Sequence, residues 1–245
     1  MKDRTVFLFQ GDSITDGQRG RNGDPNHCMG HGFAFSIASH LGLKYAEQLP
    51  SFLNRGTGGN TSAMLLERWE KDALELRPDV LTLLIGVNDL LCHCGDTSTA
   101  AERQAASPAA YRQNLRTMLS QSRQRNPALK ILLGLPFFYR IDGYDRNVHW
   151  NADETEKAFT LDFRRFTQAN AARKEADILE RQDIVREICR EFEAFPLDFP
   201  AAFSAAAKRI PIEYWTWDGV HPTVAGHQLL SSVWLDAWGA VMPEQ

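Results

Sequence analysis

A serine, a glycine-rich turn, an asparagine and an Asp–His pair stand in four short polar blocks along this 245-residue chain. Ser13 lies in GDSITDG near one end, and Asp218 and His221 lie in DGVHP near the other. A serine hydroxyl beside an imidazole that a carboxylate orients can attack an ester carbonyl. Each block alone has a simpler interpretation, since Ser13 or Asp218 could only cap a helix and His221 could be an incidental surface histidine.

The two middle blocks could supply hydrogen-bond donors for the oxyanion that forms during such an attack. NRGTGGNT at residues 54–61 offers backbone amides that glycine leaves unhindered, and GVND at 86–89 places the Asn88 carboxamide after an apolar run. Preorganised N–H groups of this kind stabilise the developing negative charge of acyl transfer. Either block could be only a turn, but four blocks that each carry suitable chemistry favour one catalytic site.

The segments around these blocks alternate between short apolar runs and longer stretches of helical periodicity, which is typical of β/α units and a largely parallel sheet. In an open sheet of this kind the loops after the strands form the ligand crevice, so the four blocks are expected to meet there. Strands are predicted at residues 5–9, 51–54, 80–85, 131–135 and 178–180, and helices at 33–41, 61–76, 108–125, 154–174, 184–192 and 223–241.

Composition and charge narrow the classes of partner. The chain is 43% hydrophobic and 24% charged with a formal net charge of −4, which leaves no basic excess for nucleic acid or an anionic membrane. No apolar run approaches the roughly 20 residues of a membrane span. The N-terminal residues lack a signal-peptide pattern, which predicts a cytoplasmic protein, although a mature secreted domain behind a new Met would read the same.

The cysteines and the closing helix have ordinary interpretations. Cys92-His93-Cys94 lacks the spacing and the second matching pair of a structural zinc site, so no metal is expected. Four cysteines are too few and too irregular for a disulfide framework. Trp234 and Trp238 stand four residues apart in the closing helix, where they indicate core packing or, if the sheet leaves them uncovered, a contact between copies in a homo-oligomer.

Taken in order from Gln10 to His227, the four blocks resemble those of the SGNH (GDSL-type) hydrolase superfamily. Within it, GDSITDGQR, NRGTGGNT and WDGVHPTVAGH look most like bacterial acetylxylan-esterase-like carbohydrate deacetylases. The resemblance covers essentially the whole chain. It implies a single domain over residues 1–245, built as a three-layer α/β/α structure with a mostly parallel, flavodoxin-like central sheet of about five strands.

The resemblance also implies a role for each matching residue. Ser13 would be the nucleophile, with Asp218 and His221 completing the triad. The oxyanion hole would comprise the backbone amides of Ser13 and Gly59 and the side chain of Asn88. The family's glycine lies five residues after the asparagine that opens its block, which selects Gly59, while Gly58 stays open as an alternative.

The function implied is a serine esterase that needs no cofactor and removes acetyl or other short acyl groups from a sugar or oligosaccharide. Aromatic residues favour a sugar, because C–H faces pack on aromatic rings. Trp217 and Tyr139, together with Asp12, are predicted to bind substrate. The alternatives are a lysophospholipase or thioesterase, which needs an apolar acyl channel, and a non-catalytic carbohydrate-binding protein of the same fold. The intact set of motif residues disfavours the last.

Overall fold

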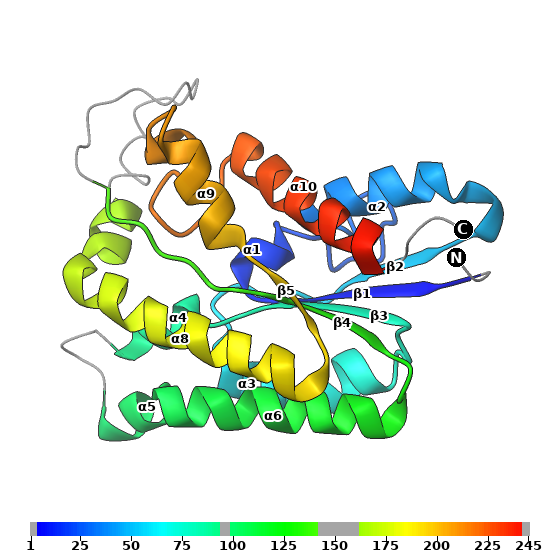
Figure 1. Cartoon of the computed structure of the whole chain (residues 1–245), viewed down its shortest axis with the longest axis horizontal. Helices are drawn as coiled ribbons and strands as arrows, with labels where there is room; N and C mark the ends of the chain where they lie inside the picture. The colour runs from blue at the N-terminus through cyan, green and yellow to red at the C-terminus, as the bar shows by residue number, and fades with distance from the viewer. Residues whose placement is uncertain (1–3, 94–98, 142–161, 242–245) are drawn as a thin grey trace.

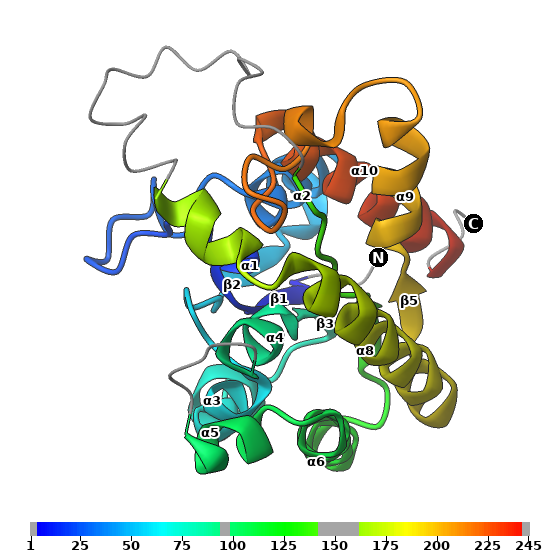
Figure 2. The same cartoon turned by 90° about the vertical axis from the view of Figure 1, so that its left-hand side faces the viewer.

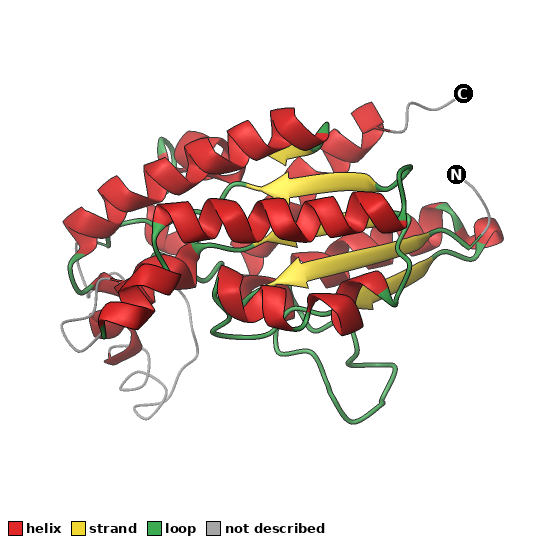
Figure 3. Ribbon diagram, turned by 90° about the horizontal axis from the view of Figure 1, so that it is seen from below, coloured by secondary structure: helices red, strands yellow, loops and turns green. Residues whose placement is uncertain are grey.

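The computed structural model describes residues 4–93, 99–141 and 162–241. A five-stranded sheet forms its centre, in the order β2-β1-β3-β4-β5, and all four pairings are parallel. Figure 3 shows the strands pointing in one direction. The strands are β1 (Val6–Gly11), β2 (Ser51–Asn54), β3 (Val80–Leu84), β4 (Lys130–Gly134) and β5 (Phe195–Leu197). The predicted α/β class and parallel sheet are confirmed, and the strand order is the flavodoxin-like one.

Helices cover both faces of the sheet and give three layers (Figure 1). One face carries α2, α9 and α10, and the other carries α3, α6 and α8. The helices are α1 (Ser13–Asp16), α2 (Phe33–Lys44), α3 (Ser62–Glu67), α4 (Val87–His93), α5 (Ala100–Ala105), α6 (Pro108–Arg125), α8 (Ala171–Phe192), α9 (Phe199–Ala207) and α10 (Val224–Val241). Helix α6 has its predicted bounds because Ser107 caps it and Pro108 occupies its first turn.

Successive strand residues enter two separate cores. In β1, Phe7 and Phe9 belong to the cluster under α2 and α10, while Leu8 belongs to the cluster on the other face. Trp234 of α10 packs against both phenylalanines, with ring centroids 6.3 and 6.1 Å away, and its Nε1 donates to Thr82 of β3 at 2.8 Å. The apolar runs without polar alternation therefore reflect burial on both faces.

The predicted strand at residues 178–180 is wrong, because these residues lie inside α8. Ile178, Val185 and Ile188 are buried and recur at helical spacing, so the period extends through the short apolar run. The fifth strand is β5, which pairs with β4 alone and therefore tolerates Pro196 at the sheet edge. The predicted helix at 154–174 lies in part outside the described residues, and the single domain expected over residues 1–245 stays a prediction.

The loops that carry the motif blocks meet at the edge where the strands end, which faces the viewer in Figure 2. The chain leaves β1 toward β2 on one side and returns to pair β3 on the other, and ligands of open α/β sheets bind at such a point. Gly11 ends β1 here, and a Cβ on it would lie 2.1 Å from the Leu84 carbonyl oxygen. Among the described helices, none combines the length and the hydropathy that a membrane crossing requires.

Candidate active site

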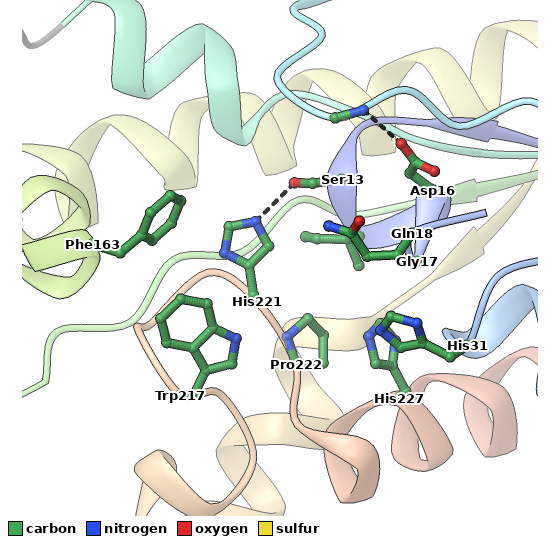
Figure 4. Close-up of a pocket in the computed structure, with 12 residues that line it drawn as sticks. Ser13, Asp16, Gly17, Gln18, His31, Phe163, Trp217, His221, Pro222 and His227 are labelled. Carbon is green, nitrogen blue, oxygen red and sulfur yellow. Dashed lines mark hydrogen bonds between the residues drawn. The ribbon is translucent and has the colours of Figure 1, made fainter. Parts of the chain in front are cut away.

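The turn from β1 into α1 presents the serine. The Asp12 carboxylate accepts a hydrogen bond from the Ile14 amide at 3.0 Å and caps α1, so that Ser13 is the first helical residue. The helix lasts four residues and ends at Gly17, which has φ +51°. Ser13 Oγ lies 2.8 Å from His221 Nε2, as the dashed line in Figure 4 shows, although 208 positions separate the two residues.

The Asp218 carboxylate orients the histidine from the opposite side. Its Oδ2 lies 2.8 Å from His221 Nδ1, and its Oδ1 accepts from the backbone amides of Val220 and His221 at 3.0 and 2.6 Å. Asp218 is fully buried. A carboxylate held in this way places the proton on Nδ1 and leaves Nε2 as the acceptor for a serine proton.

The charge around the imidazole favours its protonated form. Burial lowers the pKa of His221, but the hydrogen bond and the charge of Asp218, with the charge of Asp12, outweigh it and leave the pKa above its ordinary value of 6.5. The Asp12 carboxyl is itself enclosed, and burial raises its pKa to about 7. An imidazole with a raised pKa is a stronger base for the hydroxyl of Ser13.

Residues 162–168, which are helical, support the loop that carries Asp218 and His221. Thr167 Oγ1 and Gln168 Nε2 donate to the Asp218 carbonyl oxygen at 3.0 and 2.8 Å, and Arg164 Nε donates to the Trp217 carbonyl. None of these three residues belongs to a motif block. No spacing in the sequence pointed to them, because their role depends on a contact 50 residues away in the chain.

The two candidate oxyanion donors, Gly59 and Asn88, come from separate loops. Gly59 has φ +77°, with open space where a Cβ would project, and its amide has no acceptor among the described residues. The Gly58 amide, by contrast, donates to Asp16 Oδ2 at 3.0 Å. Asn88 Nδ2 donates to the Asn60 carbonyl at 3.0 Å, which fixes the carboxamide and leaves its second N–H free. The geometry favours Gly59 over Gly58 as an oxyanion donor.

A cavity of about 300 Å³ opens at Ser13 and His221. Phe163 and Trp217 lie at one end, and the Trp217 ring stacks on the His221 imidazole with centroids 5.6 Å apart and planes at 22°. The other end is polar, and Figure 4 shows it beyond Pro222. It is lined by Asp16, Gln18, His31 and His227.

Two predicted substrate-binding residues lie outside this cavity. Asp12 is 1% exposed and sits behind the serine as a helix cap, so the prediction that it contacts substrate is wrong. Tyr139 packs against Phe137 and Phe203 and donates its hydroxyl to the Pro200 carbonyl at 3.2 Å, so it is a core residue under the loop. Trp217 is where the sequence predicted it. The Cys92-His93-Cys94 side chains lie outside the described residues.

Comparison with known proteins identifies the family of the chain. The model of the GDSL-like lipase/acylhydrolase family covers residues 9–229. The chain belongs to this family. An acetylxylan esterase of Geobacillus stearothermophilus is 29% identical over 232 residues, which are 94% of this chain and 91% of that protein. Family membership and this relative make the chain an esterase.

Solved structures of the family share the fold along nearly the whole chain. A candidate GDSL-like lipase of Parabacteroides merdae is 33% identical with a TM-score of 0.76 and covers 98% of this chain and 97% of its own. The acetylxylan esterase Axe2 of Geobacillus stearothermophilus is 26% identical with a TM-score of 0.75, over 98% and 97%. The resemblance to SGNH hydrolases and the fold it implied are confirmed.

Asp16 stands in the GDSITDG block, where the sequence alone indicated no role for it, and it joins the serine helix to the loop at residues 54–60. It is 7% exposed, and its carboxylate accepts from the Gly58 amide at 3.0 Å and from Arg21 Nη2 at 2.7 Å. The contact to Gly58 sets the peptide plane that precedes the Gly59 amide. Asp16 therefore positions that donor through the neighbouring residue.

We expect Asp16→Ala to lower kcat for a simple acetyl ester by about 10- to 100-fold with a smaller change in KM, because a displaced oxyanion donor weakens transition-state binding. Asp16→Asn keeps an oxygen for the Gly58 amide and should recover most of the loss. Steady-state kinetics of the two variants test this. Equal losses in both would show that the charge of Asp16, and not the bond to Gly58, matters.

Proposed function

We propose that this esterase is a serine hydrolase that removes acetyl or other short acyl groups from hydroxyls of a sugar or oligosaccharide. The observation that carries the proposal is the continuous contact from Asp218 through His221 to Ser13, which lies at a cavity with one aromatic end. Ser13 is the nucleophile, His221 the base, and Asp218 the residue that orients the base.

The reaction proceeds in two acyl-transfer steps. His221 Nε2 takes the proton of Ser13 as Oγ bonds to the ester carbonyl carbon, and the oxyanion accepts hydrogen bonds from the Ser13 and Gly59 amides and the Asn88 carboxamide. The protonated imidazole then gives its proton to the leaving alcohol oxygen as the C–O bond breaks. Water attacks the acyl-serine with His221 again as base, which releases the carboxylic acid and restores Ser13.

Related proteins support these roles. Three structures of Axe2, with a serine, an aspartate or a histidine replaced by alanine, are each described as a catalytic mutant. The aspartate and the histidine stand three positions apart in that chain, as Asp218 and His221 do here. The name of the curated relative, acetylxylan esterase, favours an acetylated sugar as the substrate class.

A comparison of acyl chain length with alcohol type tests the proposal. Purified protein is assayed with 4-nitrophenyl acetate, 4-nitrophenyl octanoate and partially acetylated xylosides, with Ser13→Ala protein as the blank. We expect kcat/KM for the acetate to exceed that for the octanoate by at least about tenfold. A pocket that fits a short acyl group offers the octanoyl methylenes no apolar surface on which to be buried. A preference for octanoate would instead favour a lysophospholipase or thioesterase, and no turnover would favour a binding protein.

A further inference from the structure

The polar end of the cavity contains two histidines that the acyl-transfer mechanism does not use. His227 is in the first turn of α10, and His31 lies in the loop before α2. Both line the cavity, on the far side of Pro222 from Trp217 (Figure 4). They come from opposite ends of the chain, so neither shares an element with Ser13.

His227 is held as a neutral donor. Its Nδ1 accepts a hydrogen bond from the Phe33 amide at 3.2 Å, which requires that Nδ1 carry no proton and leaves the hydrogen on Nε2. Burial, with the charges of His31 and His221, lowers its pKa to about 4, so the ring stays neutral at pH 7. Gly32 leaves room for this arrangement, because a Cβ there would lie 3.1 Å from His227 Cε1.

The donor nitrogen of His227 has no partner among residues 4–93, 99–141 and 162–241, which the structure describes. No described residue forms a hydrogen bond with Nε2, and this atom is not fully enclosed by the protein. Since His227 lines the cavity, Nε2 is accessible from it. The His31 ring likewise has no hydrogen bond within the part of the chain that the structure describes. His227 Nε2 and the His31 ring are therefore available to form hydrogen bonds with a ligand.

The chemistry of an acetyl ester determines which part of the substrate can form hydrogen bonds with these two histidines. The carbonyl oxygen occupies the oxyanion hole, and the acyl methyl group neither donates nor accepts a hydrogen bond. Further polar contacts can therefore be made only by the alcohol part. A donor that an apolar alcohol covers would lose its hydrogen bond to water, at a cost of about 1–3 kcal/mol.

We propose that His227, assisted by His31, forms a subsite for a second hydroxyl or ring oxygen of the leaving alcohol, and so selects polyhydroxylated alcohols such as sugars. This inference rests on the proposed esterase function and deepens it. His227 donates from Nε2, and His31 can donate or accept beside it. The subsite discriminates because a site built to hydrogen-bond a hydroxyl rejects analogues that lack it.

The test separates the two nitrogens of His227. In His227→Asn, Oδ1 can replace Nδ1 as the acceptor for the Phe33 amide, but no group reaches the Nε2 position. In His227→Gln, the longer side chain returns an N–H donor near the Nε2 position and gives up the bond to Phe33. His40→Asn, at an exposed site on α2, is the matched control.

The measured quantity is kcat/KM for a monoacetylated methyl xyloside divided by kcat/KM for 4-nitrophenyl acetate. We expect this ratio to fall about tenfold in His227→Asn, to fall less in His31→Ala, to recover in His227→Gln and to stay constant in His40→Asn. An unchanged ratio in His227→Asn, including an equal loss on both esters, would overturn the subsite and leave the esterase proposal standing. Wild-type protein that cleaves neither ester would overturn both.

Discussion

Ser13→Ala is expected to lower kcat for 4-nitrophenyl acetate by about 10⁴- to 10⁶-fold, because the variant has no oxygen to bond the carbonyl carbon. Oxyanion donors and binding contacts remain and account for whatever rate survives. The side chain contributes little to the fold, since its one recorded hydrogen bond within the described chain is the contact to His221. The thermal unfolding midpoint should therefore stay close to that of the wild type.

The matched control for this substitution is Ser232→Ala. Ser232 is exposed on α10, donates to the Gln228 carbonyl at 3.1 Å and does not line the cavity. It should keep full activity. Labelling of the wild type by an organophosphate, followed by peptide mass spectrometry, should place the adduct on Ser13. Wild-type turnover in Ser13→Ala, or an adduct on a different serine, would contradict the assignment of the nucleophile.

Asp218→Asn is expected to lower kcat by about 10³- to 10⁴-fold with little change in KM. The reason lies in the two backbone amides that donate to Oδ1 of Asp218. An asparagine would turn its oxygen toward those amides and its NH₂ toward His221 Nδ1, which then must accept. The proton moves to Nε2, and the imidazole can no longer take a proton from Ser13.

The pH profile gives Asp218→Asn a second readout. Ser13 needs a neutral His221, so activity is lost as the pH falls through the pKa of the imidazole. Because Asp218 raises that pKa, the acidic limb of kcat/KM in the wild type should have its midpoint above 6.5, and the residual activity of the variant should have it lower. Asp236→Asn, at an exposed site on α10, should change neither. An unmoved midpoint in Asp218→Asn would argue against His221 as the base.

Sequence patterns predicted helices and strands well where the hydrophobic period and the length of the segment indicated the same type of element. The strands at 51–54 and 80–85 and the helix at 108–125 lie within a residue of their observed bounds. They failed at residues 178–180, where three residues of a long helix look like a short strand. They also missed β5, because its three residues include a proline and it is defined by pairing with β4.

The residues of the site also divide into those that the sequence identified and those whose roles only the structure shows. Ser13, Asp218 and His221 stand in short motif blocks, and the family resemblance of those blocks placed the three residues in one site, where the structure has them in contact. Asp16 and His227 also stand in these blocks, but the roles of both, like that of Phe163, depend on which neighbour from a distant segment each side chain meets. Asp12 is the opposite case. It is adjacent to Ser13 in sequence, which suggested a contact with substrate, but its side chain is buried behind the serine.

The packing of α10 across β1 bears on how the chain folds during its synthesis. Trp234 and Trp238 cover Phe7, whose centroid lies 6.3 and 5.2 Å from theirs, yet they are made after all five strands. Until those residues leave the ribosome, β1 lacks the two tryptophans on this face and is covered there only in part, by α2, whose Phe33 packs against Phe9. A nascent chain without α10 therefore leaves Phe7 partly uncovered, and esterase activity should emerge together with resistance to proteolysis only once α10 has been made and has packed on the sheet.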